Sequence, residues 1–275
     1  MKQSVKDSLM EEPVFLSEVA LDTNKRINYK HSKFHLFILF SVLIYLSSCN
    51  IKPPIPTPQN NKTSIDSIQI IKKTYKNSPN VVEYEFPVIK GTNKRHGIQK
   101  RFYLHGSIYS EIPYINGKRE GTALTYYPAD PDNKPAIWKE QSFVNNMLDG
   151  ICKRYHRNGT LQAEYEYKNG LPAIGMKEFS ESGQPVKLPY LILTKNKTYD
   201  GYYVTARLSN NLQMVDYYIG NLVEGKYLPE GLKGLQVKKG IGEIVVSNTT
   251  KSVTISAVYI SRFRNKCIIS KTINM

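Results

Sequence analysis

Residues 149–170 read DGICKRYHRNGTLQAEYEYKNG, and their pattern predicts the structure of the middle of the chain. Asn158 and Gly159 stand between two runs of strand-forming residues. An Asn-Gly pair in this setting is the strongest short-range signal for a β-hairpin. A two-residue turn at this pair would place Lys153 opposite Glu164, which predicts two antiparallel strands joined by a tight turn.

The same arrangement recurs along the chain around four anchor glycines, which are Gly97, Gly121, Gly150 and Gly175. Their spacings are 24, 29 and 25 residues, and a five-residue insertion within 128–136 accounts for the longest. Once this insertion is left out of the count, a glutamate follows three anchors by 14 residues, as Glu111, Glu140 and Glu164. With the same correction, an aromatic residue follows them by 17, as Tyr114, Phe143 and Tyr167. Self-similarity at this period predicts a tandem array of hairpins.

The hairpin register repeats an opposite-charge pair. It places Lys100 opposite Glu111, as it places Lys153 opposite Glu164, whereas the inserted unit has Leu124 at the lysine position. Such a cross-strand pair contributes about 0.2–1 kcal/mol. We therefore expect both pairs to lie on adjacent strands and on one face of the sheet.

Residues 116–127 (NGKREGTALTYY) and 149–170 resemble the MORN-repeat variant of YwqK-type, antitoxin-like proteins. The resemblance covers about residues 81–186. It implies an elongated, twisted sheet of tandem β-hairpins, an architecture that generally binds partners. Residues 173–179 depart from the pattern, so we expect the last unit to be a degenerate cap.

One face of this array contains a candidate partner-binding surface. Adjacent strand residues point to opposite faces, so Arg101 and Arg154 should lie opposite the Lys–Glu pairs, on a face shared with Tyr103, Tyr114 and Tyr167. Arginine beside tyrosine is typical of interface centres. Two interpretations follow: either the two guanidinium groups are free to bind a partner, or this is the buried side and each arginine extends its charge to solvent.

The N-terminal residues are typical of a bacterial lipoprotein. The apolar run FHLFILFSVLIYL (34–46) follows several basic residues and has the length of a signal-peptide core, too short to span a bilayer comfortably. The following LSSC (46–49) looks like a lipobox, in which the Cys49 thiol would receive a diacylglycerol group. We expect residues 1–48 to be a signal peptide and 49–80 a flexible Pro-rich tether.

The residues after Cys49 indicate where the lipid anchor lies. Asn50 is not the Asp that commonly retains lipoproteins in the inner membrane, and no acidic cluster resembling a surface-export signal follows. We expect an outer-membrane protein that faces the periplasm. Cys152 and Cys267 would meet an oxidising compartment there, but they fall in different expected domains, which favours two buried thiols over a disulfide.

Residues 187–275 are expected to form a second β domain. The segment SVTISAVYI (252–260) alternates apolar residues on one side, as a half-buried strand does. Six or seven such runs suggest a small immunoglobulin-like β-sandwich. The predicted fold class is therefore all-β, with a hairpin array followed by a sandwich.

Motifs of catalysis are missing from the sequence, which contains no Gly-x-Ser-x-Gly, His-Glu-x-x-His or Cys-x-x-Cys. A paired-carboxylate hydrolase stays open through the repeated glutamates, but equivalent repeat positions do not supply the unlike environments that an acid and a base need. We expect no enzyme, no cofactor and no metal site.

The net charge of +15 would suit acidic partners such as lipid head groups, anionic glycans or nucleic acid. Its even spread along the chain favours an ordinary solvated basic surface instead, and we expect no nucleic-acid partner. The first hypothesis is a lipid-anchored scaffold or binding protein of the cell envelope with an unidentified protein partner. The alternatives are an immunity protein that neutralises a toxin and a cell-wall or glycan-processing enzyme.

The lipobox generates the first prediction. Cells fed labelled palmitate should label the wild-type chain, and Cys49→Ala should lose both the label and membrane association, because the lipid is the anchor. Cys152→Ala is the control and should keep both. If Cys49→Ala still fractionates with membranes, the apolar run is itself the anchor.

Overall fold

The computed structural model describes residues 68–131 and 133–275, and their regular structure is entirely β-strand, as the sequence predicted. No helix long and apolar enough to cross a membrane occurs in these two ranges. The expected signal peptide, Cys49 and the first part of the expected tether lie outside the described residues.

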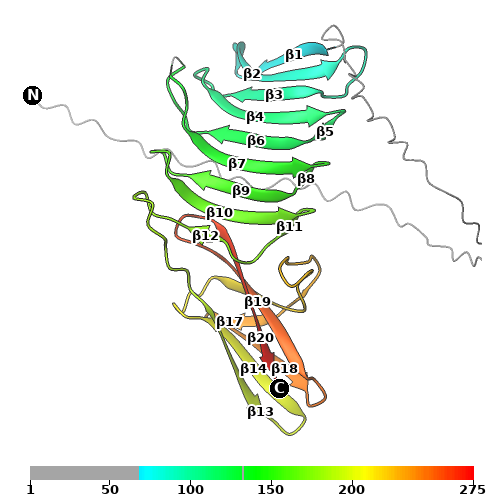
Figure 1. The fold of residues 1–275 in the computed structure, drawn as a ribbon, viewed down its shortest axis with the longest axis vertical. Coiled ribbons are helices and arrows are strands. Elements are labelled where there is room, and N and C mark those ends of the chain that lie inside the picture. Colours follow the sequence, from blue (N-terminus) through cyan, green and yellow to red (C-terminus); the bar gives the residue numbers. More distant parts are fainter. Residues whose placement is uncertain (1–67, 132) are drawn as a thin grey trace, which may run out of the picture. The chain divides into compact units, whose positions relative to one another are not determined.

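The hairpin array is one antiparallel sheet that follows the chain order (Figure 1). Its path runs β1-β2-β3-β4-β6-β7-β9-β10-β11, and the short strands β5, β8 and β12 pair with β4, β7 and β10. The strands are β1 (Ile68–Tyr75), β2 (Ser78–Ile89), β3 (Gly97–Phe102), β4 (Ile108–Ile115), β5 (Lys118–Arg119), β6 (Gly121–Tyr126), β7 (Ile137–Val144), β8 (Met147–Leu148), β9 (Gly150–Tyr155), β10 (Leu161–Lys168), β11 (Leu171–Pro172) and β12 (Lys177–Glu178).

The array starts earlier than the sequence suggested. The first strand begins at Ile68 and pairs along its length with β2, so the expected boundary at residue 81 is wrong and residues 68–80 are not tether. The polar composition of this segment concealed the strand. The strand is held by its register with β2, and Ile70 and Ile71 within it are exposed.

Two-residue turns at one edge of the sheet explain the repeated Asn-Gly pairs. Ile115 pairs with Lys118, and between them Asn116 and Gly117 have φ of 50° and 86°. A type I′ turn needs positive φ at both positions, which Asn and Gly tolerate best. The equivalent turns are Asn145–Asn146 and Asn169–Gly170. The anchor Gly121, at φ 97°, then kinks the chain between β5 and β6.

The turns at the opposite edge differ from the expected two-residue form. The His156 N–H donates to Thr160 O (2.8 Å) and the Gly159 N–H to His156 O (2.9 Å), which defines a three-residue loop. Gly159 has φ 85°, while Asn158 is absent from the positive-φ residues, so a type I′ turn does not form there. The loop shifts the hairpin register by one residue.

A one-residue bulge then restores the register. Each bulge lies two residues before the repeated glutamate, at Glu83, Tyr109, Trp138 and Gln162. Because loop and bulge shift the register in opposite senses, Lys153 faces Glu164 and Lys100 faces Glu111. Both predicted pairs are confirmed, although the turn that was expected to produce them was wrong.

The restored register aligns one residue from each main strand, and this residue is charged in every one of them except β6. We call this row the charge ladder, and it consists of Lys72, Glu85, Lys100, Glu111, Leu124, Glu140, Lys153, Glu164 and Lys177. Ion pairs join Lys72 to Glu85 at 2.9 Å and Lys177 to Glu164 at 3.4 Å. Each exposed pair contributes about 0.2–1 kcal/mol, so the ladder specifies register more than it adds stability.

Side chains at the loop edge connect successive units. The hydroxyl of Tyr103 donates to Tyr126 O (2.9 Å) and that of Tyr127 to Tyr155 O (2.8 Å). Tyr75 makes the same bond to Phe102 O (2.6 Å). These bonds link hairpins to their neighbours rather than strands within one hairpin, so they hold the units in a stack.

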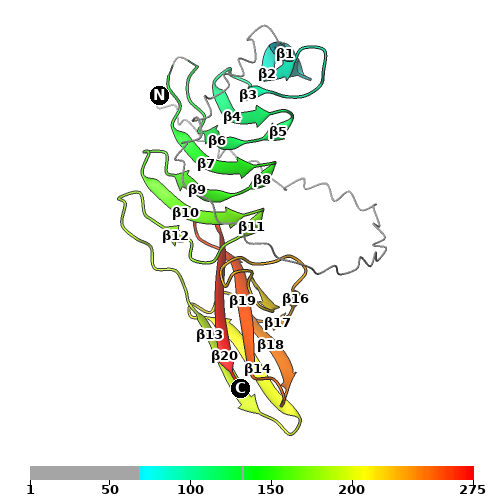
Figure 2. The same cartoon turned by 45° about the vertical axis from the view of Figure 1, so that its right-hand side comes forward.

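The C-terminal domain has two four-stranded sheets, of order β13-β14-β18-β17 and β16-β15-β19-β20 (Figure 2). The strands are β13 (Leu191–Lys197), β14 (Gly201–Leu208), β15 (Val215–Ile219), β16 (Lys233–Gly234), β17 (Gln236–Lys238), β18 (Ile241–Ser247), β19 (Ser252–Ile260) and β20 (Lys266–Asn274). In letters this order is ABED beside C′CFG, which agrees with an immunoglobulin-like pattern. The assignment to that class stays a prediction.

The core of this domain lies between the two sheets. Val204 and Leu208 of β14 and Tyr217 of β15 are almost fully buried and join one apolar cluster with β19. The expected alternation in β19 is confirmed, because Val253, Ile255, Ala257 and Tyr259 are all buried. Cys152 and Cys267 are both buried and free, as predicted.

The tyrosine bonds generate the second prediction. Tyr103→Phe should lower the free energy of unfolding by about 0.5–1.5 kcal/mol, because it removes one hydrogen bond between units. Urea unfolding measures this, with Tyr199→Phe as the control, since Tyr199 is fully exposed.

A pH series provides a second measurement. Burial raises the pKa of Tyr103 to about 12. The stabilisation from the neutral hydroxyl is therefore present below pH 10 and lost as pH rises through the folded pKa. The difference between wild type and Tyr103→Phe should shrink across that window. A difference that is absent at neutral pH would show that the bond does not stabilise the stack.

Candidate binding surfaces

The two faces of the array differ in exposure. On the face of the charge ladder, Ile98 and Ile151 are each 53% exposed, one residue after their anchor glycines. On the other face, which we call the aromatic face, Gln99, Ala123 and Cys152 follow their anchors by two residues and are all buried. The aromatic face is therefore the packed side, although it holds the five expected binding residues.

Arg101 is not free on this face. Its Nη2 lies 3.2 Å from Glu83 Oε1, and its guanidinium carbon lies 5.2 Å and 5.1 Å from the ring centres of Tyr84 and Tyr109. Glu83 and Tyr109 are bulge residues, which strict alternation does not bring to this position. The expectation of an unpaired guanidinium is wrong because a bulge supplies the carboxylate.

Arg154 binds the protein's own C-terminal domain. Its Nη1 donates to Asn265 Oδ1 (2.6 Å) and lies 3.4 Å and 3.3 Å from the carbonyl oxygens of Phe263 and Arg264. All three acceptors belong to the turn between β19 and β20. The expectation that this arginine is free is therefore also wrong, because a domain distant in sequence covers it.

The three tyrosines of the expected site also make contacts within the chain. The Tyr103 hydroxyl bonds the next unit, and the Tyr114 hydroxyl accepts from Arg95 Nη1 (3.0 Å). Tyr167 packs edge to face on Tyr165, and burial raises the pKa of Tyr167. The geometry favours the interpretation of a buried side. Contact of any of the five expected residues with a partner stays a prediction.

Glu178 of β12 is the centre of the junction between the array and the C-terminal domain. It is 2% exposed, and its Oε1 accepts from Asn265 Nδ2 (2.6 Å) and Ser261 Oγ (2.5 Å). Phe263 of the same turn packs edge to face on His156. The sequence offered no signal for this site beyond a departure from the repeat, since its partners lie more than 80 residues away.

A second loop of the C-terminal domain continues the edge of the array. Glu166 accepts from Lys226 Nζ and Tyr227 Oη, both at 2.6 Å, and these bonds hold the pKa of Glu166 below its ordinary value. The Leu228 N–H donates to Pro172 O (2.9 Å). The C-terminal domain thus bonds to the last unit, which the sequence predicted to be a degenerate cap and whose strands β11 and β12 have only two residues each.

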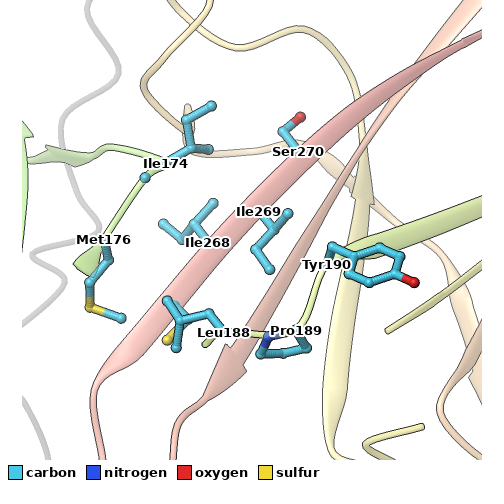
Figure 3. A pocket seen from close by; sticks show the side chains of 10 residues that line it. Ile174, Met176, Leu188, Pro189, Tyr190, Ile268, Ile269 and Ser270 are labelled. Atoms are coloured by element: carbon cyan, nitrogen blue, oxygen red, sulfur yellow. The ribbon is translucent and has the colours of Figure 1, made fainter. Parts of the chain in front are cut away.

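One apolar pocket and the grouping of possible metal ligands bear on the chemistry of the described residues. An apolar hollow beside β20 is lined by side chains such as Ile174, Met176 and Ile268 (Figure 3). Cys267 also lines it, but burial raises the pKa of this thiol to about 12, which disfavours the nucleophilic thiolate. Within 68–131 and 133–275, no three His, Cys, Asp or Glu side chains group as metal ligands would.

Comparison with known proteins identifies the repeat. The MORN repeat variant family matches residues 95–116 and 148–169, which are the first and third complete hairpin units. No curated protein and no solved structure matches the chain. The array therefore contains MORN-type β-hairpin repeats, and the structure extends it to units that the family match does not reach.

The junction generates the third prediction. Glu178→Ala should lower the free energy of unfolding by roughly 2–3 kcal/mol, because it leaves the buried amide of Asn265 and the partly buried hydroxyl of Ser261 without their acceptor. The free energy of unfolding of Glu178→Gln should lie between those of the wild type and Glu178→Ala, since an amide oxygen still accepts a hydrogen bond. Glu181→Ala, at an exposed position in the next loop, should stay within about 0.5 kcal/mol of wild type. Equal effects at both glutamates would contradict the junction.

Proposed function

We propose that this protein is a lipid-anchored binding protein of the bacterial cell envelope, and that its contact surface is the charge-ladder face of the MORN-type array. The observation that carries the proposal is the exposure of Ile98 and Ile151. They occupy the same repeat position on one face, and each is 53% exposed although it lies within a strand. Isolated exposed apolar residues are ordinary, but repetition at equivalent positions points to a shared role.

The surroundings of these isoleucines fit a protein interface. Ile98 faces Pro113 across β3 and β4, and the charge ladder runs alongside with one apolar member, Leu124. Apolar centres bordered by charged residues are the usual anatomy of such surfaces. The charges of the ladder alternate in sign, so a partner is matched by register rather than by net charge.

The anchor and the address come from the sequence. Cys49 would attach the chain to a membrane, and the segment before β1 would give the array reach. The periplasmic face of the outer membrane is our proposed location, and binding rather than catalysis our proposed activity. An antitoxin of the YwqK type would use the same kind of surface with a toxin as its partner.

Replacement of the two isoleucines generates the fourth prediction. The double variant Ile98→Lys/Ile151→Lys should fold with nearly unchanged melting temperature, because both side chains are exposed. It should lose at least about tenfold in recovery of the partner from detergent-solubilised envelope, since a buried lysine at an interface centre costs more than 1.4 kcal/mol.

The matched control is Val245→Lys, which changes an exposed strand residue of the C-terminal domain (65% exposed). It should recover partners as the wild type does. Unchanged recovery by the double isoleucine variant would remove the ladder face from the proposal. A toxin among the partners, with loss of protection in the variant, would define the binding role as immunity.

A further inference from the structure

The two ends of the array are treated differently. At the C-terminal end, loop residues 223–228 bond to the segment that follows β10. At the other end, β2 is the one strand that pairs with β1 among the described residues. The polar backbone groups on the outer side of β1 thus have no strand partner within the described ranges. An edge of this kind is a template for another strand.

β1 has the form that strand addition requires. It is eight residues long, contains no proline, and keeps an unbroken register with β2 from Ile68 to Lys73. Ile70 and Ile71 are 53% and 42% exposed, and adjacent strand residues point to opposite faces. An added strand would therefore find an apolar neighbour on each face.

The charge ladder indicates the chemistry of that strand. Lys100 lies between two ladder carboxylates, Glu85 and Glu111, and Lys153 is flanked in the same way. Lys72 lies beside Glu85 alone, and its side chain is 60% exposed. A residue of an added strand that faces Lys72 would therefore complete the pattern if it were a carboxylate. Lys73, on the opposite face, adds a second cation beside the first.

We propose that the open edge of β1 binds an extended segment of the protein partner, which adds as an antiparallel strand. Two adjacent acidic residues of this segment face Lys72 and Lys73, and the apolar residues that follow them face Ile70 and Ile71. The inference rests on the proposed binding function and names the kind of segment that is bound. Main-chain bonds give affinity, and the two carboxylates give specificity.

A second copy of this chain is a poorer occupant of the same edge. Two antiparallel β1 strands that overlap along most of their length would crowd Lys72 and Lys73 of both copies together. Like charges at facing positions destabilise a strand pair. Lysines on edge strands also protect natural sheets against self-association. The same lysines would attract an acidic segment, so the edge would bind that segment in preference to a second copy of the chain.

The test uses the full chain and a synthetic peptide, Thr-Thr-Glu-Glu-Val-Val-Thr-Thr, with a fluorescent label. Anisotropy at low salt should show tighter binding of this peptide than of the Gln-Gln analogue by about tenfold, as two cross-strand ion pairs allow. Hydrogen exchange should show new protection of amides in β1, because they gain carbonyl acceptors.

Two double variants distinguish binding at the β1 edge from a general attraction of the acidic peptide to a basic protein. Lys72→Gln/Lys73→Gln should bind both peptides equally, because it removes both cations and keeps the strand. The matched control, Lys90→Gln/Lys94→Gln, removes the same charge from the turn after β2 and should keep the tenfold preference.

Several results would overturn the inference. These are binding without preference for the acidic peptide, protection of a strand other than β1, or protection of β1 that rises with protein concentration in the absence of peptide, which would indicate self-pairing. If the β1 variant still recovers the envelope partner while Ile98→Lys/Ile151→Lys does not, the strand addition fails and the binding function stands.

Discussion

The array depends on one constraint of backbone geometry. In the hairpins β3–β4 and β9–β10, a three-residue loop is followed by a one-residue bulge, and the two register shifts cancel. Without the bulge, every residue beyond it would move to the opposite face, because side chains alternate along a strand. In these two hairpins the charge ladder and the anchor glycines stay aligned because the bulge offsets the loop.

The bulges also determine the chemistry of the aromatic face. Regular alternation of side chains along the strands would give Arg101 no carboxylate partner. The bulge residue Glu83 supplies one and forms an ion pair with Arg101. At the other end Arg154, in the equivalent repeat position, binds the β19–β20 turn. Two arginines with the same place in the repeat therefore serve different purposes, because the neighbours of a terminal unit are not repeats.

The two ends of the array differ in what covers them. The C-terminal domain contacts the last unit through Glu178 and through the loop that binds Glu166, whereas β1 ends the sheet among the described residues. Solenoid-like arrays need such ends to be protected, because each unit stabilises its neighbour. The proposed strand addition at β1 follows from that asymmetry, whereas the proposed contact face rests on the exposure of Ile98 and Ile151.

Local chemistry determined much of this fold in advance. Asn-Gly pairs mark turns, so the hairpins and their period could be predicted from residues close in sequence. The facing of Lys153 and Glu164 was predicted from a two-residue turn that does not form, and it holds because the bulge offsets the three-residue loop. The surroundings of Arg101 and Arg154 could not be predicted. A bulge changes which side chains meet without changing the pattern of residue types, and the contact with Asn265 joins segments 111 residues apart. Such contacts exist only in the folded chain, since tertiary packing alone brings distant segments together.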